Sequence, residues 1–447
     1  MIRFVGGAAA ISLLAGCAGP QPVALEPAIA PPPVYATDLP PSGIERDWWL
    51  GFDDPVLDAL IRQGIAANLD IDAAIDRLAA AEAAVRAERS DRVPFLDGTA
   101  EAGIALSRNS VVGAAAGLTG AFDPDINGRL AAEIRAAIAD YAERDYILAD
   151  QRRLVAAAIA QQYIEYRRTG AQLDLLDQST ELQERTLRIV TLRFEAGLAA
   201  NLDVRRTAAD LAQTRARRGL IAIARTEAET ALAILLAEQP GVFEVAAADS
   251  SEIPEYGLGP PVGVPADLLR RRADLLAAEA RLARAAADIG IEQADLRPAL
   301  TIPGTIGIGD GSFAGLFSDF LISLGAALDL PLFDGGRRRA EVEIAEFEAQ
   351  ARLAEYRATF LQSLGEVENA LVGIEAYRQR QSDLSEAIEQ SETALSQSDA
   401  LYREGLTSLF DVLDAQRQLI ASRQDLIDSE AALASSYAAF HVAVGAD

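Results

Sequence analysis

Two very long stretches of the chain carry apolar residues at spacings of three and four, which is the period of an amphipathic helix. They run over residues 130–193 and 337–402, with Arg, Glu and Gln between the apolar positions. Sixty-odd helical residues at about 1.5 Å each span roughly 90 Å, too long for one compact domain to cover. Each helix must therefore bury its apolar stripe against another helix, and the pattern predicts long antiparallel coiled-coil hairpins.

The chain contains an internal duplication. The segment GLAANLDV that begins at Gly197 recurs as GLTSLFDV from Gly405, and Gly128-Arg129 recurs as Gly336-Arg337. An Ala-rich stretch that ends at Pro94 has its counterpart in one that ends at Pro298. Three matches in the same order at nearly the same spacing indicate two copies of one plan. In each copy a glycine turn leads from the long helix into a returning helix.

Each copy also holds a segment rich in Gly, Ser and Thr with short alternating apolar runs, at 99–122 and 300–332. We interpret each segment as two strands and a turn. A tilted strand of about 10 residues can cross a bilayer, but four strands cannot close a barrel, so a membrane role requires several chains to share one barrel. Soluble β-hairpins at the end of a coiled coil are the alternative that the pattern leaves open.

These patterns predict the following organisation. The chain begins with a signal peptide at 1–16 and a Pro-rich tether at 17–45, followed by a first repeat at 46–237, a linker or equatorial segment at 238–265 and a second repeat at 266–447. The expected strand hairpins lie at about 97–124 and 299–332, and the expected long helices at about 128–195, 201–237, 336–403 and 409–444.

The first residues are typical of an exported lipoprotein. Arg3 precedes an apolar run over 4–14 that is too short to span a bilayer, and the run ends in Leu14-Ala15-Gly16-Cys17, which looks like a bacterial lipobox. We therefore expect Cys17 to be acylated and the protein to be anchored to the outer membrane. A chance cysteine among small residues is the alternative. No later apolar run has the length of a membrane-spanning helix.

Composition and charge exclude several functions. The formal net charge of -27 argues against nucleic-acid binding, which needs a basic face. The chain has no lysine, so lysine-dependent nucleotide sites and Schiff-base chemistry are excluded. With one Cys and one His, a zinc site built from these residues is excluded as well. We expect no enzyme activity and no cofactor, since neither GxSxG nor a second histidine is present, and we expect His441 to be a surface or interface residue.

Several motifs, in order, resemble TolC-type outer-membrane efflux proteins, in particular their NodT-like lipoprotein branch. They are Trp48-Trp49-Leu50-Gly51-Phe52 with Asp53-Asp54-Pro55, then Asn68-Leu69-Asp70, Arg271-Arg272-Ala273-Asp274, Pro331-Leu332-Phe333-Asp334-Gly335-Gly336-Arg337, and Tyr402-Arg403-Glu404-Gly405 with Asp411-Val412-Leu413-Asp414. Ala273 departs from the proline that the family usually has. The resemblance covers nearly the whole chain.

This resemblance implies a homotrimer in which four strands per chain form a shared twelve-stranded transmembrane β-barrel. Four long helices per chain would continue it as an α-barrel into the periplasm. It also implies an inner-membrane pump and a periplasmic adapter protein as partners, contact with outer-membrane lipid, and a passive exit duct without chemistry of its own. A periplasmic adapter and a structural coiled-coil envelope lipoprotein are the rival interpretations, although an adapter predicts only one helical hairpin.

The turns at the ends of the hairpins are the candidate functional site. Asp411 and Asp414 are three apart on one helix face, and threefold symmetry would make stacked acidic rings that favour cations. A helix cap is the alternative for Asp411. The resemblance implies that Tyr402 bonds Asp203 and holds a closed state, although Thr407 replaces the arginine expected beside them. It further implies that the adapter contacts Gly197, Leu198, Gly405 and Leu406. We expect the second hairpin to be the moving gate.

Overall fold

The computed structural model describes residues 47–105, 111–246, 252–257, 272–308 and 320–445. The predicted signal peptide, the lipidation site Cys17 and the predicted tether lie outside the described residues. Within them the chain forms two compact units. The first contains Ile75–Ile147 and Asp274–Thr359, and the second contains Leu148–Ala273 and the segment from Phe360 onward, together with the residues just before Ile75.

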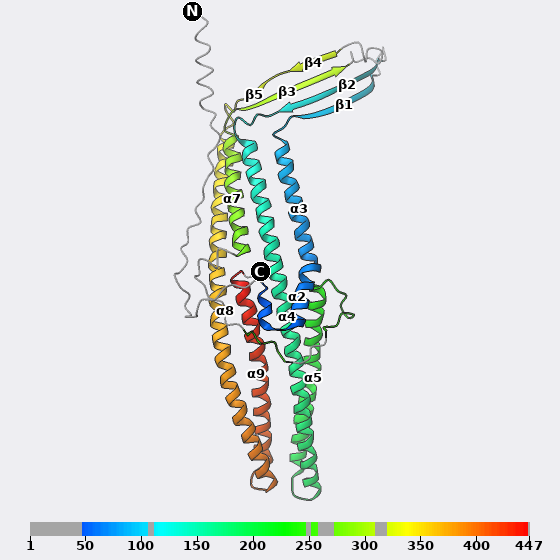
Figure 1. The fold of residues 1–447 in the computed structure, drawn as a ribbon, viewed down its shortest axis with the longest axis vertical. Coiled ribbons are helices and arrows are strands. Elements are labelled where there is room, and N and C mark those ends of the chain that lie inside the picture. Colours follow the sequence, from blue (N-terminus) through cyan, green and yellow to red (C-terminus); the bar gives the residue numbers. More distant parts are fainter. Residues whose placement is uncertain (1–46, 106–110, 247–251, 258–271, 309–319, 446–447) are drawn as a thin grey trace, which may run out of the picture. The chain divides into compact units, whose positions relative to one another are not determined.

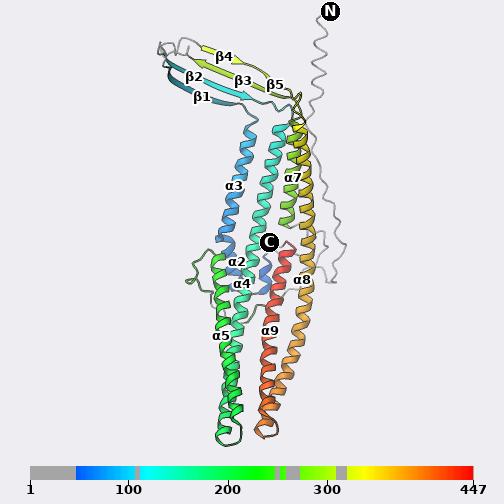
Figure 2. The ribbon, with the colours of Figure 1, turned by 180° about the vertical axis from the view of Figure 1, so that it is seen from behind.

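Two long helical hairpins dominate the chain, which confirms the predicted helical part of the fold. Helix α4 (Arg129–Glu195, 67 residues) is followed by α5 (Asn201–Leu235, 35 residues), and we name this pair the first hairpin. Helix α8 (Arg337–Arg403, 67 residues) is followed by α9 (Leu409–Ala443, 35 residues), which form the second hairpin. Both turns lie at the same end of the second unit (Figure 1, Figure 2).

The two hairpin turns have the same backbone geometry. Gly197 adopts φ +74° and Gly405 adopts φ +76°, the left-handed region that side chains with a Cβ disfavour. The N–H of Leu198 donates to the carbonyl of Arg193 at 2.8 Å, and the N–H of Leu406 makes the equivalent bond at 2.9 Å. These bonds complete a Schellman motif at each helix end, so the glycine pattern in the sequence determines where α4 and α8 stop.

The first unit contains an antiparallel sheet. Its strands are β1 (Phe95–Ala105), β2 (Val111–Phe122), β3 (Ala299–Ile308), β4 (Phe320–Leu324) and β5 (Ala327–Asp329). Their order is β1-β2-β3-β4, and β5 also pairs with β3. Strands β2 and β3 join the two sequence repeats directly, for example at Leu118 opposite Ile306. The second predicted hairpin therefore returns through two short strands instead of one.

Shorter helices lead into these strands. Helix α3 (Leu69–Ser90) precedes β1 and α7 (Ala273–Ala294) precedes β3. In the first unit, Arg281 of α7 pairs with Glu143 of α4 at 2.7 Å. Among the described residues, no helix is both long enough and apolar enough to cross a membrane.

His441 belongs to an aromatic cluster in the second unit, so its expected place at a surface or interface is wrong. The ring is fully buried and stacks on Trp48, with 5.4 Å between ring centroids. Tyr256 lies 5.1 Å away and itself stacks on Tyr437. The 3₁₀ helix η1 (Trp48–Phe52) brings Trp48 onto the end of α9, and this long-range contact removes His441 from solvent.

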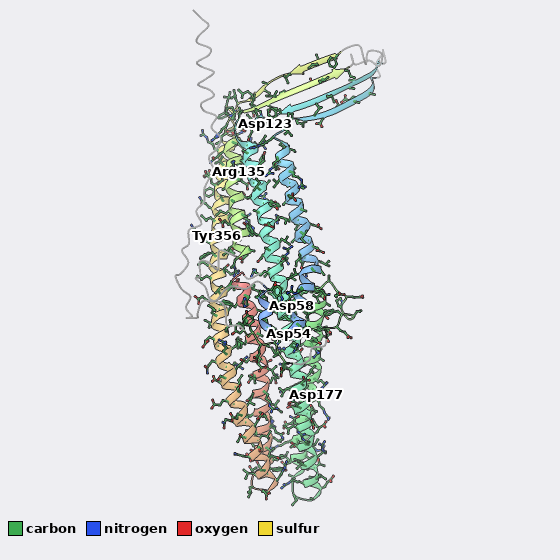
Figure 3. All side chains as sticks on the ribbon, viewed as in Figure 1. Asp54, Asp58, Asp123, Arg135, Asp177 and Tyr356 are labelled. Atoms are coloured by element: carbon green, nitrogen blue, oxygen red, sulfur yellow. The ribbon has the colours of Figure 1, made fainter. Side chains whose placement is uncertain are left out.

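The start of α2 (Pro55–Ala67) gives Asp54 of the Asp-Asp-Pro motif a structural role. Asp54 caps the helix by accepting hydrogen bonds from Val56 N at 2.9 Å and Leu57 N at 3.1 Å. Its other oxygen accepts a bond from the Tyr163 hydroxyl of α4 at 2.8 Å. Asp54 and Asp58 lie near each other at this helix start (Figure 3). One carboxylate thus both caps α2 and joins it to α4.

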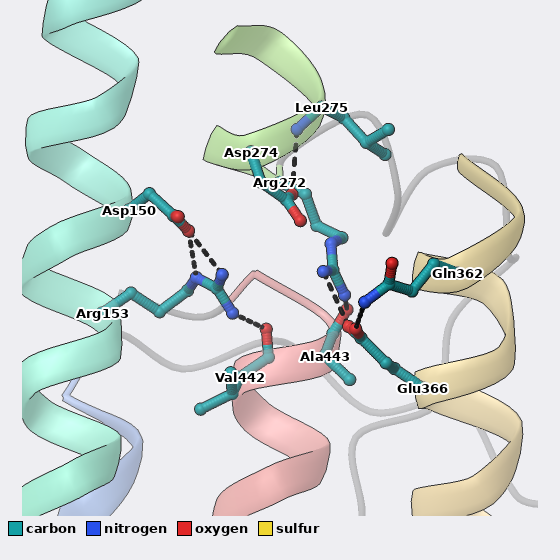
Figure 4. Close-up of polar contacts among 9 residues, drawn as sticks. All are labelled: Asp150, Arg153, Arg272, Asp274, Leu275, Gln362, Glu366, Val442 and Ala443. Carbon is teal, nitrogen blue, oxygen red and sulfur yellow. Dashed lines mark hydrogen bonds and ion pairs between the residues drawn. The ribbon is translucent and has the colours of Figure 1, made fainter. Parts of the chain in front are cut away.

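Two buried arginines hold the end of α9 (Figure 4). Arg153 of α4 donates to the carbonyl of Val442 and pairs with Asp150. Arg272 donates to the carbonyl of Ala443 at 2.6 Å and pairs with Glu366 of α8 at 2.8 Å. The last carbonyls of a helix have no partner in the helix itself, so these cations satisfy them. This contact gives the Arg-Arg-Ala-Asp motif a structural role.

Candidate gate at the tips of the helical hairpins

An apolar cluster joins the two hairpins close to their turns. Val190 of α4 packs with Tyr402 of α8 and with Leu409, Val412 and Leu413 of α9, and all five are buried. Val204 of α5 packs against this cluster. All four long helices therefore contribute to one small core at the tips, which we name the tip cluster.

Arg193 makes the polar contact between the two helix ends. Its guanidinium lies over the ring of Tyr402, 4.7 Å from the centroid. It also donates to the backbone carbonyls of Tyr402 at 3.2 Å and Arg403 at 3.3 Å. These carbonyls lie at the C-terminus of α8, where the helix dipole is negative. The sequence analysis did not identify Arg193, since an arginine in the last turn of a helix ordinarily interacts with its own helix end.

The expected hydrogen bond between Tyr402 and Asp203 is not formed in this structure. The Tyr402 side chain is buried, and its hydroxyl has no hydrogen-bond partner among the described residues. Burial raises the pKa of Tyr402, the positive charge of Arg193 opposes that shift, and the nearby charge of Asp203 adds to it. Asp203 is thus close enough for its charge to affect Tyr402, while the Arg193 guanidinium lies over the face of the Tyr402 ring.

Asp411 is a helix-capping residue. Its Oδ2 accepts hydrogen bonds from the Ser408 hydroxyl at 2.7 Å, from Ser408 N at 3.1 Å and from the Thr407 hydroxyl. Ser408 and Asp411 form a capping box at the start of α9. These hydrogen bonds, first from the hydroxyls of Thr407 and Ser408, lower the pKa of Asp411. Asp414 lies one turn further along α9, exposed, and outside this cap.

The aspartates that are equivalent in the two repeats have different surroundings. Asp203 occupies the position of Asp411, but Ala200 stands where the second repeat has Ser408. The residue before α5 therefore makes no side-chain cap, and the carboxylate of Asp203 has no hydrogen bond or ion pair within the described parts of the chain. This half-buried charge is consequently available beside Tyr402.

Two further contacts join the hairpins above the tip cluster. Arg417 of α9 pairs with Asp210 of α5, with N to O distances of 2.9 and 3.1 Å. The Gln416 amide of α9 donates to the Thr186 hydroxyl of α4 at 2.8 Å, and both residues are buried. Sequence periodicity could not identify these pairs, because they depend on how each helix is rotated against its neighbour.

The tip leucines protrude into solvent. Leu198 is 69% exposed and Leu406 is 74% exposed. In many Schellman motifs this position packs back onto its own helix, whereas here both side chains remain uncovered. The described residues contain no group of three or more His, Cys, Asp and Glu side chains placed to hold a metal ion.

Comparison with known proteins shows which family has this architecture. The outer membrane efflux protein family matches residues 60–238 and 264–446. The chain is 28% identical to the pyoverdine export outer membrane protein OpmQ of Pseudomonas aeruginosa, over 97% of this chain and 94% of OpmQ. It is 29% identical to nodulation protein T of Rhizobium leguminosarum bv. trifolii, over 89% of this chain and 87% of that protein.

Solved structures of outer-membrane proteins have the same fold as this chain. The outer-membrane channel OprN superimposes with a TM-score of 0.86 at 28% identity, covering 96% of this chain and 99% of OprN. The outer membrane protein VceC of Vibrio cholerae superimposes with a TM-score of 0.82 at 26% identity, covering 90% of this chain and 99% of VceC. Because the family match includes both repeats and most of the chain, the protein belongs to the outer membrane efflux protein family.

Proposed function

We propose that this chain is one protomer of a homotrimeric exit duct in the outer membrane, joined to an inner-membrane pump through a periplasmic adapter protein. The two hairpin turns would be the docking site for the adapter, and the tip cluster beside them would be the gate. The observation that carries this proposal is the pair of exposed leucines, Leu198 and Leu406, each held on a rigid glycine turn. Because both turns lie at the same end of the second unit, the two leucines together offer an apolar surface that a partner could cover.

The sheet supports the assembly into a trimer. Among the described residues, β1 and β4 each pair on one side only, which leaves two unpaired edges. Most of β4 is apolar and uncovered, since Phe320, Leu321, Ile322 and Leu324 are between 63% and 80% exposed. Pairing with further copies would satisfy the edges, and lipid would cover the apolar side chains. Both features fit a barrel shared by several chains.

Asp414 is the residue that we assign to ion selectivity. Asp411 is engaged in its helix cap, whereas Asp414 is exposed and lies outside the cap. In a symmetric assembly three copies of Asp414 would form a ring of negative charge that attracts cations. Asp411 would contribute charge to the same region, although its position is determined by Ser408.

The cargo is determined elsewhere in the system. Relatives of similar identity carry different names, pyoverdine export for OpmQ at 28% and toluene efflux for TtgI of Pseudomonas putida at 26%. A siderophore and a solvent share little chemistry, so a duct common to both does not select by a specific pocket. We therefore assign substrate choice to the pump.

Ion selectivity of the purified trimer in planar lipid bilayers tests this function. We expect wild type to conduct and to prefer cations, and Asp414→Asn to lower that preference measurably without abolishing conductance. Asp383→Asn, which removes the same charge from an exposed position on α8, is the matched control and should leave selectivity unchanged. Absence of conductance from wild type and from both variants would show that the chain is not a channel.

A further inference from the structure

We propose that Arg193 is the residue that holds the two hairpins together at their tips, and that the Tyr402 hydroxyl does not contribute. This inference rests on the proposed function, in which the tips form the gate. Release of Arg193 from the end of α8 would then be the step that lets the hairpins separate. Arg193 acts here as a positioning residue, through the helix end that it holds.

Arg193 makes two kinds of contact, and both reach the same helix end. The guanidinium lies over the Tyr402 ring, 4.7 Å from its centroid, and donates to the carbonyls of Tyr402 and Arg403. An aromatic face attracts a cation, and carbonyls at a helix C-terminus carry partial negative charge. Both hydrogen bonds come from Nη1 while the guanidinium plane lies over the ring, and the compact ammonium of a lysine lacks this planar geometry.

Among the residues that the structure describes, the hydroxyl of Tyr402 makes no contact of this kind, and neither does the Nε of Arg193, so the arginine acts through Nη1 and the face of its guanidinium. The Tyr402 hydroxyl is buried and makes no hydrogen bond within the described residues, and the carboxylate of Asp203 makes none either. A buried polar group without a partner destabilises the state that buries it. Removing this oxygen leaves the ring, and therefore the surface on which Arg193 lies, in place. Tyr402→Phe should consequently keep the hairpins joined.

The other contacts between the hairpins do not replace Arg193. The Arg417–Asp210 pair involves an arginine that is half exposed, and exposed ion pairs contribute little. The Thr186–Gln416 bond lies further from the turns, at a buried point between α4 and α9. Of these polar contacts, only those of Arg193 join the end of α4 to the end of α8.

Conductance of the purified full-length protein in planar bilayers distinguishes the role of Arg193 from that of the Tyr402 hydroxyl. We expect Arg193→Gln to shift the balance from closed to open by about tenfold, seen as a higher open probability. Arg193→Lys, which keeps the charge but loses the planar donors, should give an intermediate increase. Tyr402→Phe should match wild type or open less often. Arg188→Gln is the matched control, because Arg188 is an exposed arginine on the same helix.

Each outcome decides the proposal. Opening by Tyr402→Phe that equals the effect of Arg193→Gln would overturn it, because the hydroxyl would then hold the gate. Wild-type behaviour of Arg193→Gln would also overturn it. If Arg193→Gln does not fold, a higher open probability of Arg193→Lys than of Tyr402→Phe supports the proposal and equality rejects it. A wild-type protein and variants that never conduct would instead reject the channel function, and this inference with it.

Discussion

His441 lies fully buried between Trp48 and Tyr256, and neither ring nitrogen has a hydrogen-bond partner among the described residues. Burial therefore lowers the pKa of His441 from 6.5 to about 4. Between these values the unfolded chain binds a proton that the folded chain rejects. The folded state thus loses stability as the pH falls from about 6.5 to about 4, and the loss is complete below that range.

His441→Phe should remove this sensitivity to acid. A phenyl ring fills the same aromatic cluster and does not titrate, so we expect the variant to be more stable than wild type at pH 4.5 by up to about 3 kcal/mol. Near pH 7.5 the two proteins should differ much less. Thermal unfolding at both pH values measures the effect. A stability difference that does not depend on pH would mean that His441 is not the titrating group.

At the scale of elements, buried polar bonds determine how the hairpins align. The buried Gln416 amide of α9 donates to the buried Thr186 hydroxyl of α4 at 2.8 Å. Thr186→Val preserves shape but leaves the amide buried without its partner, so we expect a loss of about 1 to 3 kcal/mol in stability. Thermal unfolding of the purified protein measures it.

A double substitution provides the control for this pair. Thr186→Val combined with Gln416→Leu removes both polar partners and should recover much of the lost stability, since no buried group is then unsatisfied. Thr191→Val is the matched single control, because the Thr191 hydroxyl donates only to Leu187 of its own helix. Equal losses at Thr186 and Thr191 would indicate that the bond between the hairpins adds nothing.

The end of α9 offers a second test at this scale. Arg272→Gln removes the bond to the Ala443 carbonyl and the ion pair with Glu366, in a place where the arginine side chain is almost fully buried. We expect a loss of roughly 2 to 4 kcal/mol. Amide hydrogen exchange should show faster exchange at the C-terminal turn of α9. Unchanged exchange there would show that other groups hold this helix end.

Periodicity predicted the elements better than their contacts. The long helices followed from spacings of three and four over more than sixty residues, and the glycine turns followed from Gly197 and Gly405. Arg193 could not be found in this way, since the carbonyls that it contacts lie 209 and 210 residues later in the chain. His441 did carry a signal, because Phe440, Val442 and Val444 surround it with apolar residues in the sequence.

The second strand hairpin differs from the prediction in its number of strands. The second strand hairpin was expected to contain one returning strand, but β4 and β5 are separated at Gly325. The N–H of Gly325 donates to the Pro303 carbonyl of β3 at 3.0 Å, outside the regular ladder. A proline within β3 has no N–H to offer, so the pairing is interrupted beside it. Alternating apolar residues alone do not reveal such an interruption.

At the scale of the whole molecule, export requires the adapter to dock as well as the channel to conduct. Leu198→Asp with Leu406→Asp places charge on both exposed tips and should abolish export in cells. Neither side chain is packed in the core, so assembly and bilayer conductance of the purified double variant should remain. Export of the pump's cargo from cells together with conductance measures both effects.

The control for the tips is an exposed leucine elsewhere. Leu220 of α5 is 71% exposed and does not lie in a turn. If Leu220→Asp abolishes export as completely as the tip substitutions while conductance persists, the docking surface extends along the hairpins and is not confined to the tips. Full export by the tip variant would contradict docking at the turns.

The difference between Ser408 and Ala200 gives equivalent aspartates of the two repeats different surroundings. In the second repeat, Asp411 accepts a hydrogen bond from the Ser408 hydroxyl and caps the start of α9. In the first repeat Ala200 stands at the equivalent position, so Asp203 takes part in no such cap. The charge of Asp203 instead raises the pKa of Tyr402 on the second hairpin. A single hydroxyl thus separates two otherwise equivalent aspartates, one bound in a helix cap and one whose charge acts on the tyrosine of the other hairpin.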